Sequence, residues 1–246
     1  MSADSYYTGM ASLQAISAKM DALSANLANT QTAGYQAVQA VAQAAPYAGA
    51  NAPPGADVVA LSPGPDLRPG ALTHTGNPLT VGLGGDGWLE VQTASGTALT
   101  RNGTLQISAE GLLADGDGNP LLGADGNPIS LPKLTSLTIG SDGAISGVPV
   151  GQPGQTTSYG QLALAATPAG AMRALSGSLF LPADPTQLQQ SPAAKLSQGY
   201  LNGSNVDSVK SMVELIDVSR SYQMQTNLMK TSSDNSRALN TVLAQG

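Results

Sequence analysis

The sequence predicts an α+β protein in which long N- and C-terminal helices pair as a coiled coil. A mainly antiparallel all-β domain is inserted between them. Three observations support this: a seven-residue apolar repeat at both ends, a near absence of Gly and Pro there, and short apolar runs separated by turn pairs in the middle. The expected parts are an N-terminal helix within 1–35, an extended linker at 36–70, an outer β-rich domain at 71–198 and a C-terminal helix within 199–246.

The first helix is predicted from residues 3–29, which contain no Pro and a single Gly, Gly9. Apolar residues recur there every seventh position, with others between them at spacings of three and four, which is typical of a helix seam. Ser2 or Asp4 can cap the start, and Gly34 can supply a left-handed residue after the end. The seam residues are Tyr6, Leu13, Ile16, Met20, Leu23 and Leu27.

A second helix of about 206–243 is predicted because no Gly or Pro occurs between 204 and 245. Ser204 and Asp207 have the spacing of a capping box. The seam residues that we predict on this helix are Leu215, Val218, Tyr222, Met229, Leu239 and Leu243. Val209, Met212, Val213 and Ile216 are expected to widen the same stripe near the start of the helix.

The surface of the first helix has few charges, since only Asp4, Lys19 and Asp21 carry one. The remaining positions are mostly small and uncharged. A helix on a soluble monomer usually has a charged outer face, so this surface favours close packing against further helices. The alternative is an alanine-rich sequence without any constraint on its surface.

The linker is predicted from six prolines within 36–70, mixed with Ala and Gly. Beyond it, Asp-Gly and Asn-Gly pairs at six places predict tight turns between strands. The strands expected between these turns are 79–83, 87–93, 97–100, 104–108, 111–114, 129–131, 136–139, 144–148, 161–167 and 178–181.

Composition excludes several classes of protein. The net charge is −6 and the ten Lys and Arg residues form no cluster, which argues against a nucleic-acid or anionic-membrane surface. No apolar run reaches 18 residues, so no transmembrane helix is expected. No Lys or Arg precedes Lys19, so no Sec-type signal peptide is expected. The chain has no Cys, which excludes disulfides, thiolate zinc sites and cysteine nucleophiles.

No motif predicts an enzyme, a metal or a cofactor. The run from Asp115 to Asn119 is similar to the start of a calcium loop, but Pro120 and Gly126 break the pattern. Asp-Gly-Asn-Pro occurs at 117–120 and again at 125–128, which favours successive turns. The single His, His74, has no partner motif for a catalytic triad, and the glycines around Gly82 match no phosphate loop. Trp88 is expected to be a core aromatic, with a sugar-binding platform as the alternative.

Three stretches carry a resemblance to a known family. Residues 23–35 (Leu-Ser-Ala-Asn-Leu-Ala-Asn-Thr-Gln-Thr-Ala-Gly-Tyr) resemble the N-terminal signature of the flagellar basal-body rod and hook family, whose next residue is commonly Lys or Arg rather than Gln36. Residues 86–92 and the Thr-Arg-Asn-Gly turn at 100–103 are similar to the family's central strand pair. Residues 198–206 resemble the segment before its terminal helix, where the family usually has Glu and this chain has Asn202.

The resemblance implies a structural subunit of the flagellar basal-body rod, exported without a cleaved signal by the flagellar type III apparatus. It implies helical assembly with copies of itself and other rod proteins in a rod that crosses the periplasm and transmits torque, without direct membrane insertion. The seam residues, with Asn26, Asn29 and Gly34, would form the assembly interface. Trp88 and the run 75–81 indicate a proximal-rod member. The alternatives are a distal-rod or hook subunit, or a secreted β-rich binding module that uses Trp88 and the Asp-Gly turns.

Gly34 carries a specific conformational prediction. The helix seam stops at Leu27, and the following residues 29–33 are poor helix formers. We therefore expect the chain to turn at Gly34 with positive φ before it enters the linker.

Overall fold

The computed structural model describes residues 3–46, 56–152, 154–166, 172–183, 188–191 and 193–243. Side chains are described within these for 9–39 and for 64–235 except 232. The chain divides into two compact units. One, here called the helical unit, comprises Met1–Ala28, Val38–Pro63 and Asp207–Gly246. The other, the β unit, comprises Asn29–Ala37 and Gly64–Val206.

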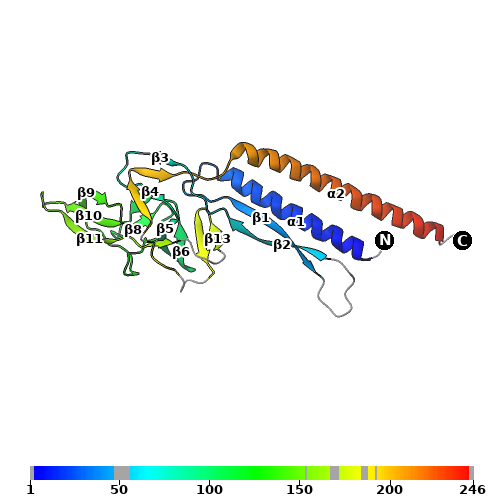
Figure 1. Ribbon diagram of the computed structural model, residues 1–246, viewed down its shortest axis with the longest axis horizontal. Coiled ribbons are helices and arrows are strands. Elements are labelled where there is room, and N and C mark those ends of the chain that lie inside the picture. Colours follow the sequence, from blue (N-terminus) through cyan, green and yellow to red (C-terminus); the bar gives the residue numbers. More distant parts are fainter. Residues whose placement is uncertain are drawn as a thin grey trace. The chain divides into compact units, whose positions relative to one another are not determined.

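The helical unit contains helix α1 (Ala3–Ala28) and helix α2 (Ser208–Leu243), which lie side by side in Figure 1. A Cβ atom placed on Gly9 would lie 3.5 Å from Sδ of Met229, so the two helices approach closely there. Asp207 caps α2, because its Oδ1 accepts the N–H of Lys210 at 3.0 Å. Neither helix is apolar enough over its described length to cross a membrane.

The segment predicted as an extended linker contains two paired strands. Strand β1 (Val38–Pro46) and strand β2 (Ala56–Pro65) form a two-stranded sheet. Extended backbone was expected from the prolines, whereas the pairing was not. Pro46 and Pro65 are the last residues of these strands, positions at which a missing N–H interrupts the ladder least.

The β unit is a set of small sheets in which all described strand pairings are antiparallel. A five-stranded sheet has the order β12-β5-β6-β14-β13, a three-stranded sheet the order β11-β10-β9, and three further pairs are β15-β4, β16-β3 and β7-β8. The strands are β3 (Leu72–His74), β4 (Val81–Gly84), β5 (Gly87–Thr93), β6 (Gly96–Thr100), β7 (Leu105–Ile107), β8 (Leu113–Asp115), β9 (Leu134–Ile139), β10 (Ala144–Pro149), β11 (Thr157–Gln161), β12 (Leu164–Ala166), β13 (Met172–Ser176), β14 (Leu179–Pro182), β15 (Lys195–Gln198) and β16 (Tyr200–Asn202).

Most predicted strands are present, and the prediction at 129–131 is wrong. That segment carries only an isolated bridge between Ser130 and Leu112. Strands β3, β11, β13, β15 and β16 had no counterpart among the predictions. The Asp-Gly turns at 117–118, 125–126 and 142–143 have positive φ at their glycines, as tight turns require.

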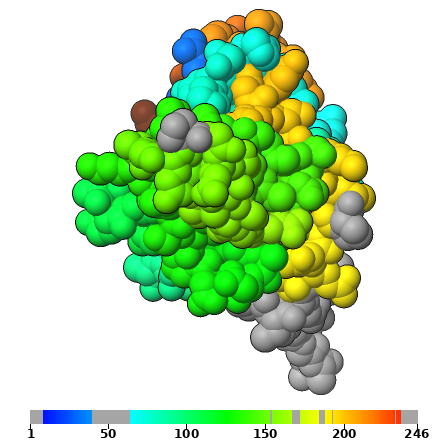
Figure 2. All heavy atoms as spheres, turned by 90° about the vertical axis from the view of Figure 1, so that its left-hand side faces the viewer, coloured from blue at the N-terminus to red at the C-terminus, as the bar shows by residue number. Residues whose placement is uncertain are grey.

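The core of the β unit is aliphatic and close to fully buried. One cluster gathers Val, Leu and Ile side chains from β4, β5 and most of the other strands. A second cluster joins Trp88, Leu99 and Phe180, with the Trp and Phe rings edge to face at 5.6 Å. Trp88 has no exposed surface, so the alternative that made it a ligand platform is wrong. Figure 2 shows residues of about 110–160, in green, at the end of this unit.

Strands near the start of the β unit pair with strands near its end. Strand β3 pairs with β16 through Tyr200 and His74, and β4 pairs with β15 through Lys195 and Gly84. Asn202 extends this pairing with its side chain, because its carboxamide donates to the Leu83 carbonyl at 3.0 Å and accepts the Leu83 N–H at 2.6 Å. Residues at the start and the end of the unit are therefore neighbours.

Candidate assembly interface

The seam predicted on α1 is partly buried, and so is the face of the helix that carries Ala22 and Asn26. Leu23 is buried, and Leu13, Ile16, Met20 and Leu27 are half-buried. Gly9 lies on the same face and approaches Met229 of α2. The side chain of Tyr6, also predicted in this seam, lies outside the described residues.

The residues of the predicted seam on α2 differ in how far they are buried. Val218 is buried, Leu215 and Met229 are half-buried, and Tyr222 is 38% exposed. The side chains of Leu239 and Leu243 lie outside the described residues. Burial thus concentrates in the first half of the described helix.

A second apolar surface lies on α2, and sequence reasoning did not separate it from the seam. Successive residues of a helix are about 100° apart, so positions 209, 212, 213 and 216 face away from Ser211 and Val218, which are buried. The expectation that these four residues widen the seam is therefore wrong. The four, here called the outer apolar face, are Val209 (71% exposed), Met212 (50%), Val213 (54%) and Ile216 (53%).

The outer apolar face has the spacing of a helix that docks on a partner. Its residues occupy positions i, i+3, i+4 and i+7. Lys210 and Glu214 flank it with an i,i+4 ion pair at 3.9 Å. Exposed apolar residues that cluster on one helix face, rather than being scattered singly, mark an interaction surface.

The turn predicted at Gly34 is confirmed, and the structure adds a second reason for glycine. Its φ is +67°, and it lies after the end of α1. Its N–H donates to the Asn202 carbonyl at 2.8 Å. A Cβ atom at this position would overlap the main chain of Arg101 and Asn102. The three stretches that carry the family resemblance therefore meet at Gly34.

The two asparagines of the N-terminal signature make internal contacts. Asn26 is buried, donates from Nδ2 to the Val38 carbonyl at 2.9 Å, and accepts the Val38 N–H at 2.8 Å. Asn29 accepts the Thr32 hydroxyl at 3.0 Å and, through its carbonyl, the Thr32 N–H at 3.2 Å. These bonds satisfy main-chain groups around the end of α1, where helical partners run out.

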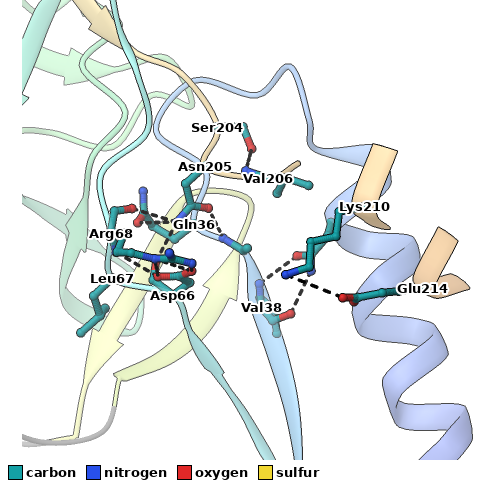
Figure 3. Close-up of polar contacts among 12 residues, drawn as sticks. Gln36, Val38, Asp66, Leu67, Arg68, Ser204, Asn205, Val206, Lys210 and Glu214 are labelled. Atoms are coloured by element: carbon teal, nitrogen blue, oxygen red, sulfur yellow. Dashed lines mark hydrogen bonds and ion pairs between the residues drawn. The ribbon is translucent and has the colours of Figure 1, made fainter. Parts of the chain in front are cut away.

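A cluster of carboxamides in the β unit was missed by sequence reasoning (Figure 3). Asn205 donates from Nδ2 to the carbonyls of Asp66 at 2.9 Å and Arg68 at 2.8 Å, and its Oδ1 accepts the Ala37 N–H at 2.6 Å. Gln36 is fully buried, and with its NH2 group turned to the same two carbonyls it donates at 2.8 and 2.9 Å. The bonded residues Ala37 and Asn205 are 168 residues apart in sequence, so no local pattern indicates such contacts.

Side chains of the 66–68 segment also interact with each other. The guanidinium of Arg68 forms an ion pair with the Asp66 carboxylate, and Asp66 Oδ1 accepts the Arg68 N–H at 3.1 Å. The hydrogen bond from Arg68 lowers the pKa of Asp66. Because the Arg68 side chain is exposed, this pair adds little stability, and its effect is to shape a local turn.

Arg101 reaches the same segment from the core of the β unit. Its Nη1 donates to the Leu67 carbonyl at 3.0 Å and its Nη2 to the Gly85 carbonyl at 3.3 Å. The guanidinium carbon stands 4.5 Å from the centre of the Trp88 ring, a cation–π contact. Burial lowers the pKa of Arg101, opposed by the nearby Asp86 carboxylate.

The candidate calcium loop is a hydrogen-bonded turn. Asp115 is buried, and its Oδ1 accepts the main-chain N–H groups of Asp117 at 3.0 Å and Asn119 at 2.8 Å. Its Oδ2 accepts the Asn119 side chain at 2.9 Å. N–H donors thus occupy the carboxylate oxygens that a cation would need. The described residues include no group of three or more acidic or histidine side chains that could hold a metal ion.

Comparison with known proteins supports the resemblance at both ends and in the centre. The family model "Flagella basal body rod protein" matches residues 7–36. The model "Flagellar hook protein FlgE/F/G D1 domain" matches residues 82–147, and "Flagellar basal body rod FlgEFG protein C-terminal" matches residues 197–242.

Whole-chain similarity is as extensive. The chain is 36% identical over 247 residues to the flagellar basal-body rod protein FlgF of Escherichia coli K12, covering 97% of both chains. It is 32% identical to FlgF of Salmonella typhimurium over 97% of both chains, and 26% identical to the rod protein FlgG of Bacillus subtilis over 94% of this chain and 95% of that protein. With three ordered family matches and this coverage, the chain belongs to the FlgF family of flagellar basal-body rod proteins.

Proposed function

We propose that this structural subunit of the basal-body rod belongs to the proximal rod, assembles helically with neighbouring rod subunits, and transmits torque through α1 and α2. Family membership makes the chain a structural protein and not an enzyme. The outer apolar face of α2 is the observation that carries the proposed mode of assembly. Trp88 and the run 75–81 support the proximal position by resemblance.

Within one subunit, the predicted seams hold α1 against α2 as a coiled coil. Support comes from the burial of Leu23 and Val218 and from the approach of Gly9 to Met229. Small residues such as Gly9 let two helices come close, and this increases the contact area. The pair then acts as one stiff element rather than two separate helices.

Between subunits, the outer apolar face packs on α1 of a neighbouring rod subunit. The exposed residues of α1 include Gln14, Ser24, Ala25 and Ala28, which are small or uncharged and offer room for large apolar side chains, together with the charged Asp21 on the same face. Burying a large apolar side chain fully contributes roughly 1.5–3 kcal/mol, so these four, which are 50–71% exposed, contribute roughly 3–7 kcal/mol per contact. Different surfaces meet in such a contact, and a heterologous contact that does not close builds an open helix.

Export by the flagellar type III apparatus fits the same features. A lone subunit leaves the outer apolar face exposed to water, and isolated helices with few charges gain little stability of their own. The helices are therefore completed by neighbours in the rod as it crosses the periplasm. No membrane insertion is needed at any step.

The test is the variant Ile216→Asp expressed in a motile host that lacks its own copy of the gene. A charge on the outer apolar face blocks burial against a neighbour, so basal bodies are recovered without a complete rod and motility is lost. The control is Thr226→Asp, which places the same charge on an exposed polar position of α2. Complete rods and normal motility in Ile216→Asp would refute the proposed contact.

A further inference from the structure

Three consecutive carbonyls of the β unit, those of Asp66, Leu67 and Arg68, all accept hydrogen bonds from side chains of other segments. Asn205 donates to the first and third carbonyls, and Gln36 donates to the same two. The middle carbonyl accepts from Arg101. We call Gln36, Arg101, Asn205 and these three carbonyls the carbonyl clamp.

The clamp is built from buried groups rather than from surface contacts. Gln36 and Arg101 have no exposed surface. Leu67 packs against the cluster of Trp88 and Phe180, so the middle residue of the segment is held through both its side chain and its carbonyl. A buried guanidinium costs free energy, and Arg101 Nε has no hydrogen-bond partner among the described residues. Buried polar side chains that bond to one short segment indicate that the position of this segment matters.

The clamped residues are those at which the chain passes between the β unit and the helical unit. The chain crosses four times, between Ala28 and Asn29, between Ala37 and Val38, between Pro63 and Gly64, and between Val206 and Asp207, and the clamp lies beside the last three crossings. Ala37 is bonded to Asn205 Oδ1 through its N–H and to the Asp66 N–H through its carbonyl, at 2.6 and 2.7 Å. Asn205, the residue before Val206, thus ties together the segments beside three of the four crossings inside the β unit.

We propose that the carbonyl clamp is a torsional joint inside the β unit: Asn205, as a positioning residue, binds the β-unit sides of three chain crossings to each other, so that load on one of these segments is shared by all three. A single chain segment twists freely about its φ and ψ angles, whereas segments bonded to each other twist only if those bonds break. This role rests on the proposed function as a rod subunit. It adds a requirement that assembly alone does not impose.

The test compares Asn205→Asp with Asn77→Asp in the full chain. Aspartate at 205 keeps the acceptor for the Ala37 N–H and removes both donors to the 66–68 segment. Asn77 is exposed and uses Oδ1 to accept the Leu79 N–H at 2.9 Å, a bond that aspartate preserves, so it is the matched control. Hydrogen exchange of the amides of Asp66 and Arg68 is measured in both variants, with Asn205→Ala as a third variant that also removes the acceptor.

Asn205→Asp is expected to raise exchange at Asp66 and Arg68 about tenfold, since two hydrogen bonds are lost, while core amides of β5 and β6 exchange as in the parent chain. In Asn205→Ala, hydrogen exchange of the Ala37 amide is expected to rise as well, because its acceptor is lost. In cells, basal bodies with Asn205→Asp are recovered in normal number, and swimming falls steeply as the viscosity of the medium increases.

Three outcomes overturn the joint. Exchange at Asp66 and Arg68 that matches the Asn77→Asp control would mean that the clamp does not hold the segment. Raised exchange with normal swimming at every viscosity would mean that the clamp carries no load. Missing basal bodies would mean that the clamp serves assembly and not transmission. The proposed function fails separately, through complete rods in Ile216→Asp.

Discussion

Replacing Gly34 by alanine tests the close packing of the family signatures against each other. The residue has φ of +67°, and a Cβ atom would come closer than 3.0 Å to the main-chain nitrogen of Asn102 and the carbonyl of Arg101. These are backbone atoms in the turn after β6, so the obstruction cannot be relieved by a change of rotamer. Either the turn or the signature must move.

The expected cost has two parts. A left-handed conformation costs a non-glycine residue about 1–2 kcal/mol. Forcing an extra group against closely packed atoms adds about 1–3 kcal/mol. Gly34→Ala should therefore lower the free energy of unfolding of the β unit by roughly 2–5 kcal/mol.

Gly126→Ala is a control that separates the two parts. Gly126 has φ of +77°, and a Cβ there would meet nothing within 4 Å, so only the conformational cost of about 1–2 kcal/mol applies. Unfolding in guanidinium is followed by the fluorescence of Trp88, the only Trp of the chain, which lies in the core of the β unit. Variants whose unfolding free energies agree within about 0.5 kcal/mol would refute the close approach at Gly34.

Two further outcomes are expected. Ile16→Asp places a charge in the seam that we predict on α1, so it should abolish motility and rod recovery while the Trp88 emission of the purified chain stays native; normal motility would contradict the role of the seam. Burial raises the pKa of Glu90 in β5, so the folded state favours the protonated carboxyl group. At neutral pH the carboxyl group is ionised, and the buried charge lowers the stability of the folded state. Glu90→Gln should therefore raise the thermal midpoint at pH 7, and the gain should shrink as pH falls toward the ordinary pKa of a glutamate side chain; a gain independent of pH would contradict the assignment.

The helices were predictable because their signal is local. A long stretch without Pro or Gly and with a regular apolar period indicates a helix whatever surrounds it, and α2 starts within two residues of its predicted position. The outer apolar face was harder to predict. Apolar residues occur on both sides of α2 near its start, so Val213 and Val218 fit one widened stripe as well as two opposite ones.

The strands and the carbonyl clamp were less accessible for different reasons. β11 is exposed on both faces except at Tyr159, so it lacks the alternation that identifies a strand. β15 and β16 are short, and they form strands by pairing with partners more than 100 residues away in sequence. Asn205 and Gln36 donate to main-chain carbonyls. Every residue has such a carbonyl, so no pattern of side chains in the sequence indicates these contacts.

The pairing of β3 with β16 and of β4 with β15 has a consequence for timing. A ribosome releases the chain from its N-terminus, so β3 and β4 emerge more than 100 residues before their partners. Long-range antiparallel pairing is also slow, because a large loop must close before any contact forms. The β unit thus stays open during most of synthesis and completes its fold only when residues 195–202 arrive. Because of this delay, the β unit of the growing chain remains unfolded polypeptide, which is the form that the proposed export requires.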